Sequence, residues 1–370
     1  MPEEKVRVIQ VAQGGSFGGK EDPIFHAHLA LGVLKTGRPV RIVLTREESL
    51  RVHVKRHPAV MWYKAGADEQ GHVLAIDYQV TLDTGAYMSL GYDVLENMVV
   101  FGAGPYYVPN LRLDGKAWYT NNVLSGAMRG FGVNQVAFAL EQVMDELARE
   151  LGIDPFEFRL INGLEPGLPT ASDHVLETGV PAHKETVRAA HEAFKKLKLP
   201  KAEGNRRIGV GVASAVKNIG FGHDIPESAG TILEMDKDGY LTLKVTHHEY
   251  GQGGQAGQVK LVINELGIPA ERIKVVGPDT AQTVPTGPTT ASRQTFLTGN
   301  ATVMACKALR EDLMGRAAEV IDVQPHKLEF QGDRIVDPES GASVPLSELG
   351  ERFVYKRIYY PPRTAAKLPV

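Results

Sequence analysis

The amino-acid sequence predicts an α+β fold made of two mixed α/β subdomains. Segments with an apolar period of two and segments with a helical period both occur, but they do not alternate as regular βαβ units. A polar stretch broken by Pro and Gly, residues 199–207, separates two halves that each contain both kinds of segment. We therefore expect one domain over residues 1–200 and a second over residues 201–370.

The elements of the first half follow from apolar periodicity and from end signals. Asp-Pro pairs at 22–23 and 154–155 are typical of helix starts, and Gly152 is placed to close a helix. Helices are expected from Pro23 to about Leu34 and over 134–151, 155–160 and 182–197. Alternating segments rich in β-branched residues predict strands at 6–12, 40–44, 61–67, 73–83 and 111–119.

The second half repeats this mixture of strands and helices. Strands are predicted at 208–216, 230–235, 241–247 and 273–276, and helices at 255–266 and 298–320. The one cysteine, Cys306, lies among Ala, Met and Val in the last helix, so it is expected in the core rather than as a nucleophile.

Composition excludes several classes of protein. The chain has 370 residues, 43% of them apolar, and 41 basic against 44 acidic residues, which gives no basic surplus for nucleic acid. One cysteine cannot form an internal disulfide, an iron–sulfur cluster or a Cys-rich zinc site. No apolar run is long enough to span a bilayer, and the polar N-terminus does not resemble a signal peptide. We expect a cytoplasmic protein with neither a nucleic-acid nor a membrane partner.

Glycine is concentrated in four short blocks rather than in linkers. The chain has 39 Gly, and the blocks are GGSFGG at 14–19, GAMRGFG at 126–132, GQGGQAG at 251–257 and PTGPTTASRQT at 285–295. Glycine is needed where the backbone takes positive φ or approaches another group closely. The blocks therefore predict a ligand that is held mainly by backbone.

The first block resembles a phosphate loop only in part. Gly14, Gly19 and Lys20 match the Walker pattern, but Glu21 stands where that pattern needs a hydroxyl, and a carboxylate there repels phosphate. The dinucleotide fingerprint fails because Ser16 replaces its second Gly. Two interpretations stay open: a tight strand–helix turn, or a backbone cradle for an anionic ligand.

The other blocks offer polar groups, each with a structural alternative. The planar guanidinium of Arg129 can donate several hydrogen bonds at once to a ligand that carries several acceptor atoms. The alternative interpretation is an ion pair between Arg129 and a carboxylate at the surface. The side-chain amides of Gln252 and Gln255 either donate hydrogen bonds to a polar ligand or are simply solvated. The Ser/Thr-rich run around Arg293 is an anion site at a helix N-terminus or an ordinary helix cap. The His247-His248-Glu249 run has no zinc spacing, and we expect no protein-ligated metal.

Taken in order, the four blocks resemble one family over nearly the whole chain. GGSFGGKE, AMRGFG-x-x-Q, YGQGGQAG and TTASRQTFLTGNA are similar to motifs of the molybdopterin-binding subunit of the xanthine dehydrogenase / aldehyde oxidase family of molybdenum hydroxylases. That resemblance implies the fold of two molybdenum-cofactor-binding subdomains.

The resemblance also assigns roles residue by residue. It implies that the first block brings backbone to the molybdenum and pterin, that the second stands beside the metal and shapes the substrate pocket, and that the last two hold the pterin, phosphates and nucleotide. The implied cofactor-binding residues are Gly15, Phe17, Gly18, Arg129, Gly130, Phe131, Gln252, Gly253, Ser292, Arg293 and Gln294. The implied catalytic-pocket residues are Arg129, Glu21 and Glu96.

The function implied is the oxidation of an aldehyde or an N-heteroaromatic compound, with water as the oxygen source. The ASRQT form resembles bacterial members that use molybdopterin cytosine dinucleotide, and Asn97 stands where xanthine-oxidising members carry Arg, which disfavours a purine. Iron–sulfur clusters and FAD are expected on partner chains.

The family's Gly-x-Gly-Glu segment, which carries the catalytic base, has no counterpart here, and the last residues resemble a linker that precedes it. We expect a central portion of the family's polypeptide, either one subunit of a divided enzyme or a truncated gene product. A further chain would carry the remaining molybdenum domain and its Glu, and this chain alone would be inactive. Two alternatives stay open: a non-catalytic cofactor-binding or assembly subunit, and a P-loop-like nucleotide-binding protein.

Overall fold

The computed structural model describes residues 2–175, 182–221, 225–350 and 352–362. Its contacts form two compact units, each described here by itself. The N-terminal unit comprises residues 17–217, and the C-terminal unit comprises residues 1–16 and 218–365. The sequence analysis expected a single boundary near residue 200, whereas the contacts group residues 1–16 with the second half of the chain.

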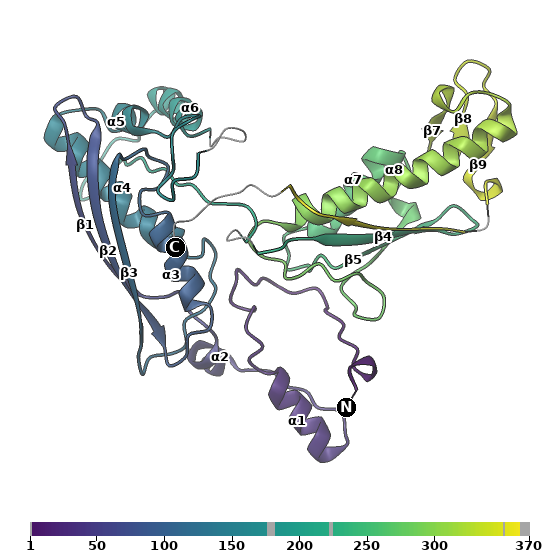
Figure 1. Cartoon of the computed structure of the whole chain (residues 1–370), viewed down its shortest axis with the longest axis horizontal. Coiled ribbons are helices and arrows are strands. Elements are labelled where there is room, and N and C mark those ends of the chain that lie inside the picture. The colour runs from purple at the N-terminus through teal and green to yellow at the C-terminus, as the bar shows by residue number, and fades with distance from the viewer. Residues whose placement is uncertain (1, 176–181, 222–224, 351, 363–370) are drawn as a thin grey trace. The chain divides into compact units, whose positions relative to one another are not determined.

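A three-stranded sheet carries the core of the N-terminal unit (Figure 1). Strand β1 (Ala59–Ala67) pairs antiparallel with β2 (Val73–Gly85), which pairs parallel with β3 (Asn110–Tyr119). Alternation along β2 buries Tyr78, Val80 and Leu82 on one face of the sheet. Helices α3 (Gly91–Val100) and α4 (Val133–Leu151) contribute Met98, Leu140 and other apolar residues to the same core.

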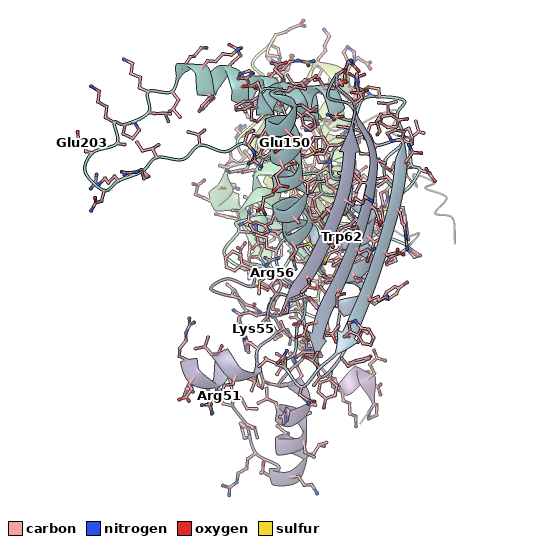
Figure 2. The ribbon with its side chains drawn as sticks, turned by 90° about the vertical axis from the view of Figure 1, so that its left-hand side faces the viewer. Arg51, Lys55, Arg56, Trp62, Glu150 and Glu203 are labelled. Atoms are coloured by element: carbon pink, nitrogen blue, oxygen red, sulfur yellow. The ribbon has the colours of Figure 1, made fainter. Side chains whose placement is uncertain are left out.

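Helix ends in this unit follow the expected signals. Gly152 takes a left-handed conformation and closes α4, and the Asp154 carboxylate accepts hydrogen bonds from the first N–H groups of α5 (Pro155–Asn162). Helix α6 (His183–Lys196) follows. Before the sheet come α1 (His26–Thr36), which has no buried residue, and α2 (Arg46–Val52), which begins with a Thr45/Glu48 capping box. Figure 2 shows Lys55 and Arg56 on the segment between α2 and β1.

The C-terminal unit has a four-stranded sheet in the order β10-β4-β5-β6. Its strands are β4 (Ala229–Met235), β5 (Leu241–Val245), β6 (Ile273–Val276) and β10 (Phe353–Tyr359). Helices α7 (Gly254–Leu266) and α8 (Gln294–Ile321) run along the sheet (Figure 1), and Cys306 lies fully buried in the core that they share with it. A small sheet follows, made of β7 (Glu329–Gln331), β8 (Arg334–Val336) and β9 (Ser343–Pro345).

Short 3₁₀ turns complete the structure at Glu3–Lys5, Ala270–Arg272, Pro325–Lys327 and Leu346–Glu348. Among the residues that the structure describes, no helix combines the length and apolar character needed to cross a bilayer.

The α+β class is confirmed, and most predicted elements are present, but three predicted strands are wrong. Residues 40–44 and 208–216 form no ladder, and residues 6–12 make a single bridge between Ile9 and Asp279. A strand needs a neighbouring strand to satisfy its backbone groups, and none pairs with these segments within the described residues. The first helix begins at His26 rather than Pro23 because a turn follows Pro23.

Candidate functional site

The second part of the first glycine block, residues 17–19, meets the second block inside the N-terminal unit. The Arg129 N–H donates to the Phe17 carbonyl at 2.8 Å. Gly18 has φ +97°, and a Cβ there would lie 2.8 Å from the Ala127 carbonyl oxygen, so the close approach of the two loops requires glycine. Phe17 and Phe131 both hold positive φ, a conformation that side-chain-bearing residues adopt at a cost. The two blocks therefore form one strained, closely packed loop pair.

This loop pair presents side chains outward. Phe17 is 65% exposed, and Arg129 is also exposed. Within the described residues the Arg129 guanidinium makes no hydrogen bond or ion pair, so the surface ion pair that the sequence left open is not formed there. Its carbonyl instead accepts a hydrogen bond from Arg56 Nη2 at 2.8 Å. The backbone of Arg129 is therefore held in place, while the N–H groups of its guanidinium have no partner within the described residues.

Several buried polar atoms around the loop pair have no hydrogen-bond partner within the described chain. They are Asp22 Oδ2, Arg56 Nη1, His57 Nε2 and Gln135 Oε1. Asp22 Oδ2 lies 2.9 Å from the position of a Cβ on Gly126, and Gln135 Nε2 donates to the His57 carbonyl. Buried polar groups without partners are costly, so their concentration at one place indicates a site that receives polar atoms from a ligand or from ordered water.

The electrostatics of this region favour neutral histidine. Burial lowers the pKa of His57, which is only 2% exposed, while the carboxylates of Asp83 and Asp22 oppose that shift. Burial also lowers the pKa of Arg56. Sequence reasoning missed Asp22, Arg56 and His57 as site residues. Gln135, however, ends the RGFG-x-x-Q motif and could have been chosen from it.

The two predicted pocket carboxylates are carried by different elements. Glu21 follows the first loop and donates its N–H to the Gly18 carbonyl at 3.2 Å. Glu96 lies on α3, whose Met98 side chain and Val94 carbonyl abut Gly132 of the second loop. No helix begins directly after Lys20, since α1 starts at His26, so the loop lacks the helix N-terminus that a phosphate loop uses.

In the C-terminal unit, three segments join to form a second loop cluster. The Gln13 N–H donates to the Glu249 carbonyl at 2.9 Å, which holds the segment that contains Gly15 against the third block. The His248 N–H donates to Thr289 Oγ1 at 3.0 Å, which joins the third block to the fourth. The unit therefore gathers its predicted site residues on adjacent loops.

The third block is stiffened by its own polar side chains. Gln252 Oε1 accepts from the Tyr250 N–H, and Gln252 Nε2 donates to the His248 carbonyl. Glu249 accepts backbone N–H groups of Gly251, Gly253 and Gln255. Burial acts to raise the Glu249 pKa, but these hydrogen bonds outweigh it and hold the pKa below its usual value. The surface that remains open here is mainly backbone.

The fourth block holds its charged and amide side chains inside the protein. Arg293, 2% exposed, donates to Glu227 and to the carbonyls of Thr286, Pro288 and Ser228. Gln294 is also buried, with its amide directed to Pro288 and Thr298. Ala291 and Ser292 have φ +53°, and Ser292 is exposed just before α8. Backbone and hydroxyl groups, rather than the guanidinium, are presented at this helix start.

No group of three or more metal-ligating side chains occurs among the described residues. Within the N-terminal unit, strained backbone, the exposed side chains of Phe17 and Arg129, and buried polar atoms without partners form a candidate ligand site.

Comparison with known proteins assigns both units to one class. Family models described as "Molybdopterin cofactor-binding domain" match residues 1–163 and 184–364. The chain is 39% identical over 320 residues to a probable xanthine dehydrogenase subunit of Bacillus subtilis, a match that covers 86% of this chain and 43% of that protein. It is 33% identical over 313 residues to the aldehyde oxidoreductase of Megalodesulfovibrio gigas, covering 83% of this chain and 34% of that protein.

Solved structures agree with these sequence matches. The aldehyde oxidoreductase from Desulfovibrio desulfuricans superposes with a TM-score of 0.76 at 29% identity, over 96% of this chain and 37% of that one. The quinoline 2-oxidoreductase of Pseudomonas putida shares the fold, with a TM-score of 0.80 at 22% identity over 97% of this chain and 50% of that one. The chain therefore contains two molybdopterin cofactor-binding domains. It belongs to the xanthine dehydrogenase / aldehyde oxidase family of molybdenum hydroxylases and spans less than half the length of the curated relatives it matches.

Proposed function

We propose that this chain holds the molybdenum cofactor of a molybdenum hydroxylase that oxidises an aldehyde or an N-heteroaromatic compound, with water as the oxygen source. The observation that carries the proposal is the strained loop pair joined by the Arg129–Phe17 hydrogen bond, with buried polar atoms open around it. When bound, the cofactor supplies an oxygen nucleophile and accepts the electrons from the substrate carbon, while the protein orients the reacting groups.

The chain's residues divide this work between the two loop clusters. Phe17 and Gly18 present backbone to the pterin and metal end, Arg129 stands beside that end, and Gly130 and Phe131 shape the adjoining substrate pocket with Glu21 and Glu96. Gly15, Gln252 and Gly253 contact the pterin. Ser292 and the start of α8 face the phosphates of a cytosine dinucleotide form. Arg293 and Gln294 support that loop from inside, because their donors already bind protein groups.

Partners complete this enzyme. We propose an iron–sulfur subunit, an FAD subunit and a polypeptide with the catalytic Glu as these partners, since the curated relatives extend well beyond the region that this chain matches. Two relatives carry names that describe one subunit of a divided enzyme, which supports this organisation. They are the probable xanthine dehydrogenase subunit of Bacillus subtilis and the nicotinate dehydrogenase "large molybdopterin subunit" of Eubacterium barkeri.

The test is a dye-linked oxidation assay with benzaldehyde and with nicotinate as substrates. We expect no turnover by the chain alone and turnover by the complex purified with its partner subunits. We also expect that Gly18→Val abolishes the activity of the complex. Gly14→Ala is the control, because nothing lies within 4 Å of a Cβ there. Turnover by the isolated chain would contradict the proposed division, and an inactive complex with both substrates would contradict the substrate class.

A further inference from the structure

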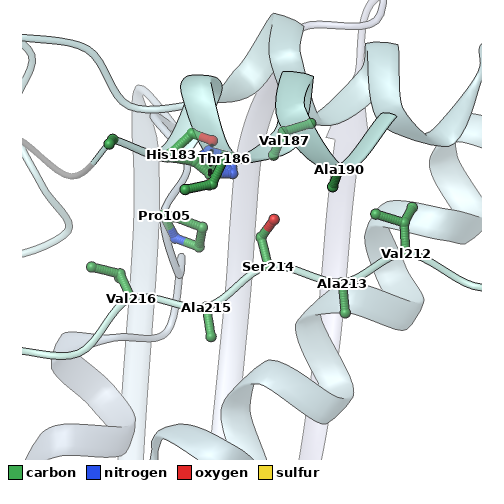
Figure 3. Close-up of a pocket in the computed structure, with 11 residues that line it drawn as sticks. Pro105, His183, Thr186, Val187, Ala190, Val212, Ala213, Ser214, Ala215 and Val216 are labelled. Atoms are coloured by element: carbon green, nitrogen blue, oxygen red, sulfur yellow. Dashed lines mark hydrogen bonds between the residues drawn. The ribbon is translucent and has the colours of Figure 1, made fainter. Parts of the chain in front are cut away.

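The extended segment 208–216 has the pattern of a strand but no strand beside it among the described residues. Its residues alternate between half-buried and exposed from position 212 onward. Figure 3 shows the side chains of Val212, Ser214 and Val216 on the side that faces α6, and those of Ala213 and Ala215 on the opposite side. Within the described chain, its one backbone hydrogen bond runs from the Ser214 N–H to Glu141 Oε2 at 2.8 Å.

That hydrogen bond defines which edge of the segment is open. Along an extended chain, the N–H and C=O groups of alternate residues point to opposite edges. Since Ser214 directs its N–H toward Glu141, residues 212 and 216 share the anchored edge. Residues 213 and 215 direct their backbone groups to the other edge, where the described chain offers no partner. Unpaired edges of this kind are templates for adding a strand.

A buried polar cluster fixes the segment in place. Glu141, 6% exposed, accepts hydrogen bonds from Tyr106 Oη at 2.6 Å and from Arg159 Nε at 2.8 Å besides that of Ser214. Arg159 is fully buried and also donates to Asp145 and to the Pro155 carbonyl. Because the segment is held before any partner arrives, a strand that pairs with it loses less conformational entropy on binding.

A cavity of about 370 Å³ lies between this segment and α6. Its lining combines apolar residues, among them Pro105, Val187, Ala190, Val212 and Val216, with the polar side chains of His183, Thr186 and Ser214 (Figure 3). The Thr186 hydroxyl already donates to the His183 carbonyl, whereas the two ring nitrogens of His183 are buried and have no hydrogen-bond partner among the described residues. An added strand places every second side chain on this face, so it can fill the cavity with apolar side chains beside Val187 and Val212 and with a polar group beside His183.

We propose that segment 208–216 receives a β-strand from the polypeptide that carries the rest of the molybdenum domain, with side chains of that strand filling the cavity beside α6. The length of the relatives supports this occupant, since the matched region covers 43% of the Bacillus subtilis protein and leaves more than half of that protein without a counterpart here. This inference rests on the proposed function for the identity of the partner, but its test does not depend on cofactor binding.

The experiment is residue-resolved amide hydrogen exchange of the full chain, alone and in the complex with the polypeptide that carries the Gly-x-Gly-Glu segment. We expect exchange at Ala213 and Ala215 to slow by about 100-fold in the complex. Ala213→Pro removes one open-edge donor and should weaken assembly by at least about tenfold, since proline cannot join a strand ladder there. Val210→Pro is the matched control, because residue 210 shares the anchored edge with Ser214 and does not line the cavity.

Thermal unfolding of the free variants separates a defect of assembly from a defect of folding, and Ala213→Pro should unfold within a few degrees of Val210→Pro. Equal exchange in the free chain and in the complex would overturn the proposal. So would protection in the chain alone that rises with its concentration, since a second copy would then occupy the edge. Molybdenum content is read on the same complex: metal without protection rejects only this inference, and protection without metal rejects only the proposed function.

Discussion

Arg129 in the N-terminal unit stands in a glycine-rich loop and Arg293 in the C-terminal unit stands in a Ser/Thr-rich loop, each ahead of a long helix, yet their environments are opposite. The Arg129 guanidinium is exposed and makes no hydrogen bond or ion pair within the described residues. The Arg293 guanidinium is buried, donates to Glu227 and three carbonyls, and lies over the Phe221 ring. One arginine is free to act on a ligand, and the other builds the loop that meets a ligand.

The comparison shows why a motif alone does not assign a role to each of its residues. The arginine of one loop directs its guanidinium N–H groups to the surface, whereas the arginine of the other loop directs them to groups inside the protein. Which of these occurs depends on whether carbonyls and a carboxylate from distant positions, such as Glu227 and Thr286, converge on the side chain.

The largest effect is expected at Arg293. Arg293→Met leaves the Glu227 carboxylate without its buried partner, and we expect a loss of about 3–5 kcal/mol in the free energy of unfolding of the C-terminal unit. Urea denaturation of the full chain measures this. A loss below about 1 kcal/mol would mean that Arg293 is not the internal support described above.

Gly18 tests the other loop with an intermediate effect. Gly18→Ala places a Cβ against the Ala127 carbonyl and should cost about 1–3 kcal/mol, as well as lowering the molybdenum content of the assembled complex. Gly37→Ala is the control, since Gly37 also has positive φ but nothing lies within 4 Å of its Cβ. If both substitutions lower the metal content equally, the contact between the two loops has no role in the site.

Each loop cluster also has a buried neutral histidine, which predicts a pH dependence. Burial lowers the pKa of His57 in the N-terminal unit and of His247 in the C-terminal unit. The unfolded chain protonates these rings near the ordinary pKa of about 6.5, whereas the folded chain resists protonation. The stability they contribute is therefore present above that pH and is lost as the pH falls toward the folded pKa.

The measurement is urea denaturation at about pH 7.5 and about pH 5.5, where the chain should be less stable at the lower pH. His57→Gln and His247→Gln should each reduce the difference between the two values. An unchanged difference in both variants would show that other groups carry the acid sensitivity.

The smallest effect on stability is expected at Arg129. Because its side chain is exposed, Arg129→Met should change the free energy of unfolding by no more than about 0.5 kcal/mol. The same variant should lose substrate oxidation in the assembled complex. A destabilisation as large as that of Arg293→Met would remove the contrast between the two loops.

The sequence predicted elements correctly where their partners lie in the same chain. Strands β1, β2 and β3 and helix α4 follow from periodicity because each buries its apolar face against another of these elements. The predictions were wrong at 6–12, 40–44 and 208–216, which have the same kind of pattern but no neighbouring strand in the described chain. An alternating apolar pattern shows that a segment can form a strand, but the strand forms only where a neighbouring strand pairs with it.

The candidate site could be predicted as four loops but not as a set of contacts. Glycine blocks mark where backbone must be close to other groups, and the structure joins the first with the second and the third with the fourth. The open polar atoms of Asp22, Arg56 and His57 had no local signal, because they reach the loops through tertiary packing. Their contribution is visible only once the chain is folded.

The central claim is that these two domains hold a molybdenum cofactor of the cytosine dinucleotide type. The most direct measurement is the molybdenum and CMP content of the chain purified together with its partner subunits, after acid release of the nucleotide. The account predicts both, in equal amounts and near one per chain. A complex that contains neither molybdenum nor CMP would contradict it.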